Sequence, residues 1–166
     1  MIYSRDKRLL FPAFRASIEM FEAELQGRGL PFHLFMAFRD PWTQQELYEQ
    51  GRSTPGKIVT NARGLPAPES WHCYGLACDY VLDSMPEKPG LQWSWETRNV
   101  DFNQDGTNDW QQMGAIAESL GLQWGGRWKR FPDLPHIQNN YGLSIVEAKQ
   151  IYLQDGIKAV WRECGA

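Results

Sequence analysis

The sequence has few cysteines, little excess charge and no long apolar run. With three cysteines among 166 residues, the chain is not a scaffold held together by disulfides. A net charge of −3 argues against a protein whose affinity comes from a broad basic surface, as in most nucleic-acid-binding proteins. The longest apolar stretches, 9–12 and 31–38, are far shorter than the roughly 20 residues that a membrane span needs.

The overall composition is that of one globular domain. An apolar fraction of 42% and a charged fraction of 22% are ordinary, and a chain of this length can bury a core without disulfides. We therefore expect a single domain over residues 1–166. The N-terminal segment 1–21 has neither the apolar run nor the small-residue cleavage site of a signal peptide, so we expect synthesis in the cytoplasm.

Hydrophobic periodicity and turn residues predict a mixture of helices and short strands. We expect helices at 8–28, 44–51, 109–120, 144–153 and 157–163, and strands at 31–38, 76–82, 122–128 and 135–138. Residues 43–46 and 144–147 match the capping box that begins a helix. Long Gly- and Pro-rich loops are expected at 52–69 and 84–108. Because helices and strands do not alternate in a regular βαβ order, the pattern favours an α+β fold.

Two of the three histidines lie near acidic residues that suit metal chemistry. Two imidazoles with one carboxylate are a common catalytic zinc set, which leaves a fourth position for water. Asp79 follows His72 by seven positions across a turn at Gly75, and His136 would come from a distant strand. Asp133 precedes His136 by three residues and is placed to act as a general base.

Other interpretations of these residues stay open at this point. A lone histidine is more often structural than a ligand, and His33, inside an apolar run, favours a position in the core or at its edge. Cys73 and Cys78 adjoin the candidate ligands, and thiolates also bind zinc, so a His/Cys site is a rival. In a strand, Cys78 and Asp79 point to opposite faces, so only one of them can face a metal.

Several short segments, occurring in order, resemble the zinc D-alanyl-D-alanine peptidase family. This family includes the L-alanyl-D-glutamate endopeptidases of phage endolysins and bacterial autolysins, and the chain is most similar to that branch. The matching segments are 38–40 with Gln44, 47–52, 55–62, 70–79, 120–126 and 133–136. The resemblance implies a hedgehog-like α+β domain, a small antiparallel sheet flanked by helices, with a catalytic core at about 30–140 and a helical tail at 141–166.

The resemblance also implies a ligand set and a base. One zinc ion would be bound by His72, Asp79 and His136, and Asp133 would be the general base. Under this interpretation the two cysteines are small buried apolar residues, with a redox-sensitive pair as the lesser alternative.

Three further residues gain implied roles in the site. Arg39 would polarise the scissile carbonyl and stabilise the oxyanion, a task that suits a fixed guanidinium. Without the family, a surface salt bridge to Asp40 or Glu46 would be the simpler role for Arg39. Ser70 and Gln44 would line the substrate site.

The implied activity is hydrolysis of the L-alanyl-D-glutamate bond in the stem peptides of peptidoglycan. A D-alanyl-D-alanine carboxypeptidase is the alternative within the enzyme class, and a non-catalytic peptidoglycan-binding domain is the alternative outside it. Without a signal peptide, the protein would reach the periplasm or cell wall through a holin or a similar pore. We expect a monomer that has no nucleic-acid partner and does not insert stably into a membrane.

Residues 101–112 are a separate candidate metal site. They match the EF-hand calcium loop at positions one, three, five, six and nine, with a backbone carbonyl at position seven. The residues that would bind calcium are Asp101, Asn103, Asp105, Thr107 and Asp109. Position twelve, normally a bidentate glutamate, is Gln112. The alternative is a polar turn in which Asp109 caps the following helix and Gln112 occupies its third position.

Tryptophan is the one residue type in excess. Six of the eight tryptophans lie between residues 71 and 128, namely Trp71, Trp93, Trp95, Trp110, Trp124 and Trp128. They are either large core residues or part of a groove that stacks on the sugar rings and peptide stems of a cell-wall polymer. We favour the core for Trp124 and Trp161, and the groove for Trp71, which adjoins the candidate ligand segment.

Overall fold

The computed structural model of the chain describes residues 3–83, 93–94, 96–98 and 100–166. The chain divides into two compact units. Unit 1 comprises residues 1–13, 36–77 and 140–166, and unit 2 comprises residues 14–35 and 78–139. Among the described residues, no helix has the length and the apolar character that crossing a membrane requires.

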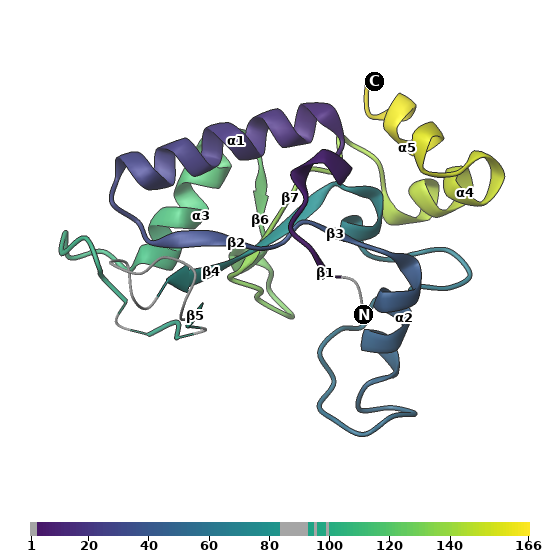
Figure 1. Cartoon of the computed structure of the whole chain (residues 1–166), viewed down its shortest axis with the longest axis horizontal. Helices are drawn as coiled ribbons and strands as arrows, with labels where there is room; N and C mark the ends of the chain where they lie inside the picture. Colours follow the sequence, from purple (N-terminus) through teal and green to yellow (C-terminus); the bar gives the residue numbers. More distant parts are fainter. Residues whose placement is uncertain (1–2, 84–92, 95, 99) are drawn as a thin grey trace. The chain divides into compact units, whose positions relative to one another are not determined.

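Unit 2 is built on a five-stranded sheet. The strands follow the order β2 (Phe32–Met36), β4 (Ala77–Asp83), β7 (His136–Gln138) and β6 (Gln123–Trp124), and β5 (Trp93–Ser94) pairs with β4. The pairs β4–β5 and β6–β7 are antiparallel. Helix α1 (Pro12–Gly27) runs along the sheet in Figure 1, and α3 (Asp109–Ser119) completes the unit. This is the α+β architecture with a small antiparallel sheet that the sequence predicts.

Helix α1 buries one apolar face in the core of unit 2. Its buried residues recur at the four-, three- and four-residue steps of an amphipathic helix, and they are Phe14, Ile18, Phe21 and Leu25. Phe21 packs edge-on against Tyr80 of β4, with 5.2 Å between the ring centroids. The helix begins at Pro12 rather than at residue 8, because proline has no N–H to donate and favours the first helical position.

Trp124 joins α3 to the segment that follows β6. Its ring lies between Gly114 of α3 and Gly126 of the 3-10 helix η3 (Gly125–Arg127), and a Cβ atom at either glycine would collide with the ring. The indole Nε1 donates a hydrogen bond of 2.8 Å to the carbonyl oxygen of Leu134. Trp124 is buried, which confirms its predicted place in the core.

Unit 1 combines a two-stranded antiparallel sheet with short helices. Strand β1 (Tyr3–Ser4) pairs with β3 (Phe38–Arg39), and the helices are η1 (Lys7–Leu9), α2 (Pro41–Glu49), η2 (Trp71–Tyr74), α4 (Ile145–Asp155) and α5 (Ile157–Glu163). The Phe11 ring contacts Tyr141 and Trp161, at centroid distances of 5.2 and 5.9 Å. The half-buried Trp161 therefore belongs to the apolar packing of this unit, as expected for it.

The start of α2 corrects a sequence prediction. A capping box beginning at Thr43 is wrong, because Asp40 is the N-cap and its carboxylate accepts hydrogen bonds from the N–H groups of residues 42 and 43, each 3.0 Å long. Pro41 occupies the first helical position, which its fixed φ angle favours. The Thr43 hydroxyl is instead a third donor to the Asp40 carboxylate.

The other caps and the long loops also test the sequence analysis. Ser144 and Glu147 form the predicted capping box of α4. At α3 the N-cap is Asn108, so the alternative that placed Asp109 in this role is wrong. The expected loop 84–108 lies partly outside the described residues, and its described part contains β5.

The Gly114–Trp124 contact predicts a specific cost for one added methyl group. Gly114→Ala should lower the free energy of unfolding by about 1–3 kcal/mol, because the new Cβ overlaps a ring that has no room to move. The matched control is Gly27→Ala at the end of α1, where a Cβ meets no atom within 4 Å. This control should be neutral or stabilising by up to about 1 kcal/mol. Equal effects of both substitutions in urea unfolding would contradict the packing argument.

Candidate active site

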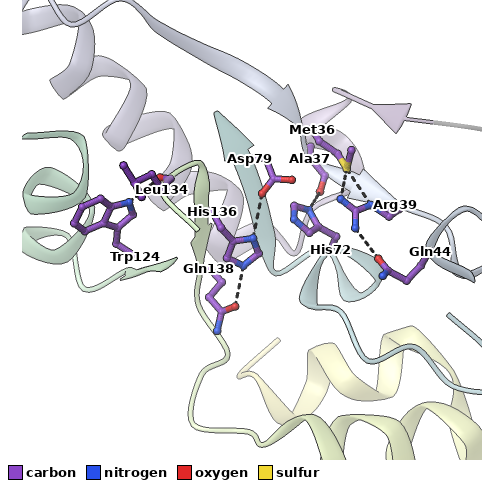
Figure 2. Close-up of polar contacts among 10 residues, drawn as sticks. All are labelled: Met36, Ala37, Arg39, Gln44, His72, Asp79, Trp124, Leu134, His136 and Gln138. Atoms are coloured by element: carbon purple, nitrogen blue, oxygen red, sulfur yellow. Dashed lines mark hydrogen bonds and ion pairs between the residues drawn. The ribbon is translucent and has the colours of Figure 1, made fainter. Parts of the chain in front are cut away.

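His72 is presented by the short helix η2 in unit 1. The helix ends at Gly75, whose φ of +66° and close approach to the Leu9 carbonyl leave no room for a side chain. His72 is 2% exposed, and its Nδ1 lies 3.1 Å from the carbonyl oxygen of Ala37, as Figure 2 shows. A carbonyl only accepts, so this contact places the proton on Nδ1 and leaves the lone pair on Nε2.

The C-terminal helices and Pro68 anchor the segment that carries His72. The Tyr74 hydroxyl donates to the carbonyl of Pro68 at 2.7 Å, and the Trp161 indole donates to the carbonyl of Tyr74 at 2.7 Å. Lys149 of α4 forms a 2.6 Å ion pair with Glu69, directly before η2. The tail at 141–166 thus helps to position a candidate ligand.

Arg39 ends β3 and is buried in unit 1. Arg39 is 8% exposed, and its Nη1 donates to Oε1 of Gln44 at 2.6 Å (Figure 2). Nε and Nη2 lie 3.0 and 2.7 Å from Sδ of Met36. Gln44 is fully buried and donates through Nε2 to the carbonyl of Ala62 at 2.7 Å. Gln44 therefore holds Arg39 and the 60–62 segment together, a role that the sequence did not reveal.

Asp79 and His136 face each other in unit 2. Asp79 is the only half-buried residue of β4, whose other residues are all buried. His136 of β7 is 7% exposed, and its Nδ1 lies 3.1 Å from Oδ1 of Asp79. Its Nε2 lies 2.9 Å from Oε1 of Gln138 (Figure 2). Gln138 in turn donates through Nε2 to Oε1 of Gln123 at 2.8 Å.

Gln138 is a supporting residue that the sequence analysis missed. It follows His136 by two positions in a strand, so both side chains lie on one face of β7. That spacing was the available signal, but only the register with β6 shows that Gln123 orients the Gln138 amide.

The negative charges near His136 favour positive charge at its imidazole, either a proton or a bound cation. Burial of the imidazole lowers its pKa, but the hydrogen bond with Asp79 and the charges of Asp79 and Asp133 outweigh that effect. The pKa of His136 is therefore raised above its ordinary value.

Asp133 is held next to His136 by a tight turn. The His136 N–H donates to the carbonyl of Asp133 at 3.2 Å, and the Asp133 N–H donates to the carbonyl of Gly125 at 3.0 Å. A side chain at Gly125 would place its Cβ 2.5 Å from the Asp133 carbonyl oxygen, so this close approach requires glycine. The half-buried Asp133 carboxylate thus belongs to the same local structure as a candidate ligand.

The donor types favour zinc bound by imidazole and carboxylate. His72, Asp79 and His136 each offer one ligand atom of a kind that zinc prefers. Burial raises the pKa of the Cys73 thiol to about 12, and the nearby Arg39 only partly opposes this, which disfavours the thiolate of the rival His/Cys site. His33 lies in β2, with Nδ1 3.8 Å from a carboxylate oxygen of Asp83.

Comparison with known proteins identifies the family. A family described as D-alanyl-D-alanine carboxypeptidase matches residues 63–139. The peptidoglycan L-alanyl-D-glutamate endopeptidase CwlK of Bacillus subtilis is 41% identical over 130 residues, which is 78% of this chain and 72% of that protein. The chain therefore belongs to the zinc D-alanyl-D-alanine peptidase family, as its motifs predict.

Two further proteins are similar to this chain. The L-alanyl-D-glutamate peptidase of a Listeria phage is 33% identical over 96 residues, which is 57% of this chain and 30% of that protein. The crystal structure of the Serratia marcescens L-Ala D-Glu endopeptidase ChiX superposes with a TM-score of 0.52 and 24% identity, covering 82% of this chain and 84% of that one. The latter match shows a shared fold.

The Glu69–Lys149 pair predicts a pH-dependent contribution to stability. Lys149 lowers the pKa of Glu69 below 4.5 through their hydrogen bond, and burial only partly opposes this. Stability from this pair is therefore complete above pH 4.5 and is lost as the pH falls through the lower folded-state pKa. At pH 7, Glu69→Gln should cost a few tenths to about 1 kcal/mol.

A double-mutant cycle isolates this contribution. In a Lys149→Met background, Glu69→Gln should have little effect at pH 7, because the partner is already absent. A cost of Glu69→Gln that persists unchanged at pH 3, or in the Lys149→Met background, would contradict the role of the ion pair.

Proposed function

We propose that this protein is a zinc-dependent endopeptidase that hydrolyses the L-alanyl-D-glutamate bond of peptidoglycan stem peptides. The observation that carries the proposal is the 41% identity to the Bacillus subtilis endopeptidase CwlK over 130 residues. The name of that enzyme gives both the polymer and the bond. The chain retains every candidate ligand and the candidate base, which argues against a non-catalytic wall-binding domain.

The proposed zinc ligands are His72, Asp79 and His136. The hydrogen bond from Nδ1 of His72 to a backbone carbonyl leaves Nε2 as its ligand atom. Gln138 accepts from Nε2 of His136, which leaves Nδ1 on the side of Asp79 as the second imidazole ligand. Because Gln123 fixes the orientation of the Gln138 amide, the contact with Gln138 defines the tautomer of His136.

The remaining residues supply proton transfer and charge stabilisation. When bound, zinc acts as a Lewis acid and lowers the pKa of its water to about 7. Asp133 accepts the proton of the attacking water and returns it to the leaving amine, so that the peptide bond breaks without release of a free amide anion. Arg39 stabilises the negative charge that develops on the scissile carbonyl oxygen.

Substrate contacts are assigned to residues near His72. Ser70 and Trp71 are half-buried and directly precede His72, so they are proposed to contact the stem peptide. Gln44 was expected to line the substrate site, but its complete burial and its bond to Arg39 support a positioning role instead. The holin-dependent export, the periplasmic site of action and the monomeric state stay predictions from the sequence.

Substitution of the base and of a ligand should have different consequences. Asp133→Ala should retain zinc and lose most turnover, because it removes the proton acceptor and no ligand. His72→Ala should lose both zinc and turnover. Zinc content measured by mass spectrometry, together with release of amino groups from purified sacculi, checks both outcomes. Asp155→Ala, at the exposed end of α4, is the control and should change neither quantity.

The products identify the bond that is cleaved. A new N-terminal D-glutamate in digested muropeptides is expected for the endopeptidase. Release of terminal D-alanine would instead identify a D-alanyl-D-alanine carboxypeptidase, the activity in the description of the matched family. Sedimentation with sacculi without any product would identify a wall-binding protein.

Because the Arg39 side chain is buried and bonded to Gln44, we expect that a positive charge alone at this position does not support full turnover. Arg39→Lys should reduce kcat by roughly 10²–10³-fold with zinc content unchanged, because lysine cannot contact Gln44 and the substrate oxyanion with one planar group. Arg127→Lys, at an exposed ion pair with Glu118, is the matched control and should retain full turnover. Full turnover of Arg39→Lys would exclude the assigned role.

A further inference from the structure

The loop before α3 contains a buried carboxylate oxygen without a hydrogen-bond partner. Asp109 is 0% exposed. Its Oδ2 accepts a 2.9 Å hydrogen bond from the N–H of Phe102, while its Oδ1 has no partner among the described residues. Leaving a buried carboxylate oxygen unpaired is costly, so this atom is a candidate ligand for a group of positive charge.

Two other carboxylates lie close enough to Asp109 to repel its charge. Burial raises the pKa of Asp109, and the charges of Asp101 and Asp105 raise it further. Among the described residues, the hydrogen bonds to Asp101 and Asp105 come only from neutral amides. The three carboxylates therefore gather negative charge around the unpaired oxygen of Asp109.

The side chain of Gln112 points back into this loop. Its Nε2 donates to Oδ1 of Asp105 at 3.1 Å and to the carbonyl of Thr107 at 3.3 Å. These oxygens occupy positions five and seven of the twelve-residue pattern, and Gln112 occupies position twelve. An amide group thus reaches the oxygens that would surround a cation, and rotation of that amide by half a turn would present Oε1 in place of Nε2.

We propose that residues 101–112 bind one calcium ion. Its ligands would be the side chains of Asp101, Asn103, Asp105 and Asp109, the carbonyl oxygen of Thr107 and Oε1 of Gln112. The calcium ion would bind the unpaired Oδ1 of Asp109 and neutralise the charge of the three carboxylates. Calcium is favoured over magnesium, because it accepts flexible coordination by many oxygens, whereas magnesium demands near-ideal octahedral geometry.

The composition of the site sets its affinity and its effect. Gln112 supplies one neutral oxygen where the EF-hand has a bidentate carboxylate, so binding is weak, with Kd on the order of 10⁻⁴–10⁻³ M. The loop leads directly into α3, whose Gly114 packs on Trp124. Calcium binding therefore stabilises the helix and, through it, the core of unit 2.

Calorimetric titration and thermal unfolding of the full chain test the proposal. The zinc-loaded protein, freed of calcium by passage over a chelating resin, is titrated with calcium chloride and in parallel with magnesium chloride. We expect one calcium ion per chain and a Tm that rises with calcium concentration, with a smaller response to magnesium. Absence of a calcium-dependent heat and of any Tm shift at about 10 mM, well above the expected Kd, would overturn the proposal.

Charge substitutions distinguish a calcium site from a polar turn that is complete by itself. Gln112→Glu restores the bidentate ligand and should lower the calcium Kd by at least about tenfold. Gln111→Glu adds the same charge at the exposed neighbouring position and should leave Kd almost unchanged. Equal effects of both variants would show non-specific attraction, and binding by Gln112→Glu alone would show that the natural loop is a turn closed by the Gln112 amide. Either outcome overturns the proposal.

Loss of a ligand gives the opposite test. Asp101→Asn replaces a half-buried carboxylate that remains able to accept hydrogen bonds, and it should abolish the calcium response without unfolding the chain. Asp109→Asn should do the same and, in the absence of calcium, should not lower Tm, because it removes an unpaired buried charge. The His72→Ala variant should keep the full calcium response, so this test is independent of the zinc site. A normal calcium response in Asp101→Asn and Asp109→Asn would contradict the assigned ligands.

Discussion

The burial of strand β4 is the constraint on which unit 2 depends. The strand lies between β2 and β7 and also pairs with β5, and every one of its residues except Asp79 is buried. A carboxylate in such a strand is tolerated only when a partner compensates for the loss of water, and His136 of the neighbouring strand provides that partner at 3.1 Å. The core of unit 2 and the Asp79–His136 pair therefore depend on one another, because the strand pairing that buries the apolar residues also sets Asp79 against His136.

Close backbone packing supports this arrangement from the other side of β7. The ring of Trp124 requires glycine at the two positions that it contacts, Gly114 and Gly126. Its indole N–H fixes the carbonyl of Leu134, the residue after Asp133. Gly125 permits the turn that carries Asp133 to His136. The abundance of tryptophan thus has a structural explanation at this position, since a large rigid ring with one polar atom both fills the core and holds a functional loop.

The parts of the structure that sequence could predict are those that depend on neighbouring residues. The spacing of Phe14, Ile18, Phe21 and Leu25 identifies the buried face of α1, and the α4 capping box is local. Competition between local signals explains the error at α2, where Asp40 and Pro41 together outweigh Thr43. The supporting roles of Gln44 and Gln138 depend on contacts with residues 18 and 15 positions away, which no local pattern specifies. The candidate ligands are identified by ordered motifs that the chain shares with a family. Such motifs reflect common ancestry more than the local physical chemistry of the sequence.

The burial of the cysteines has a practical consequence for the chemistry of this protein. Cys73, Cys78 and Cys164 are all buried thiols, and burial raises the pKa of Cys73 to about 12 and that of Cys164 to about 11. Because the thiolate is the reactive form, these side chains are poor targets for oxidants and alkylating reagents at neutral pH. The folded protein therefore reacts only slowly with thiol reagents. A single cysteine introduced at an exposed position would be labelled selectively, without replacement of the three native cysteines.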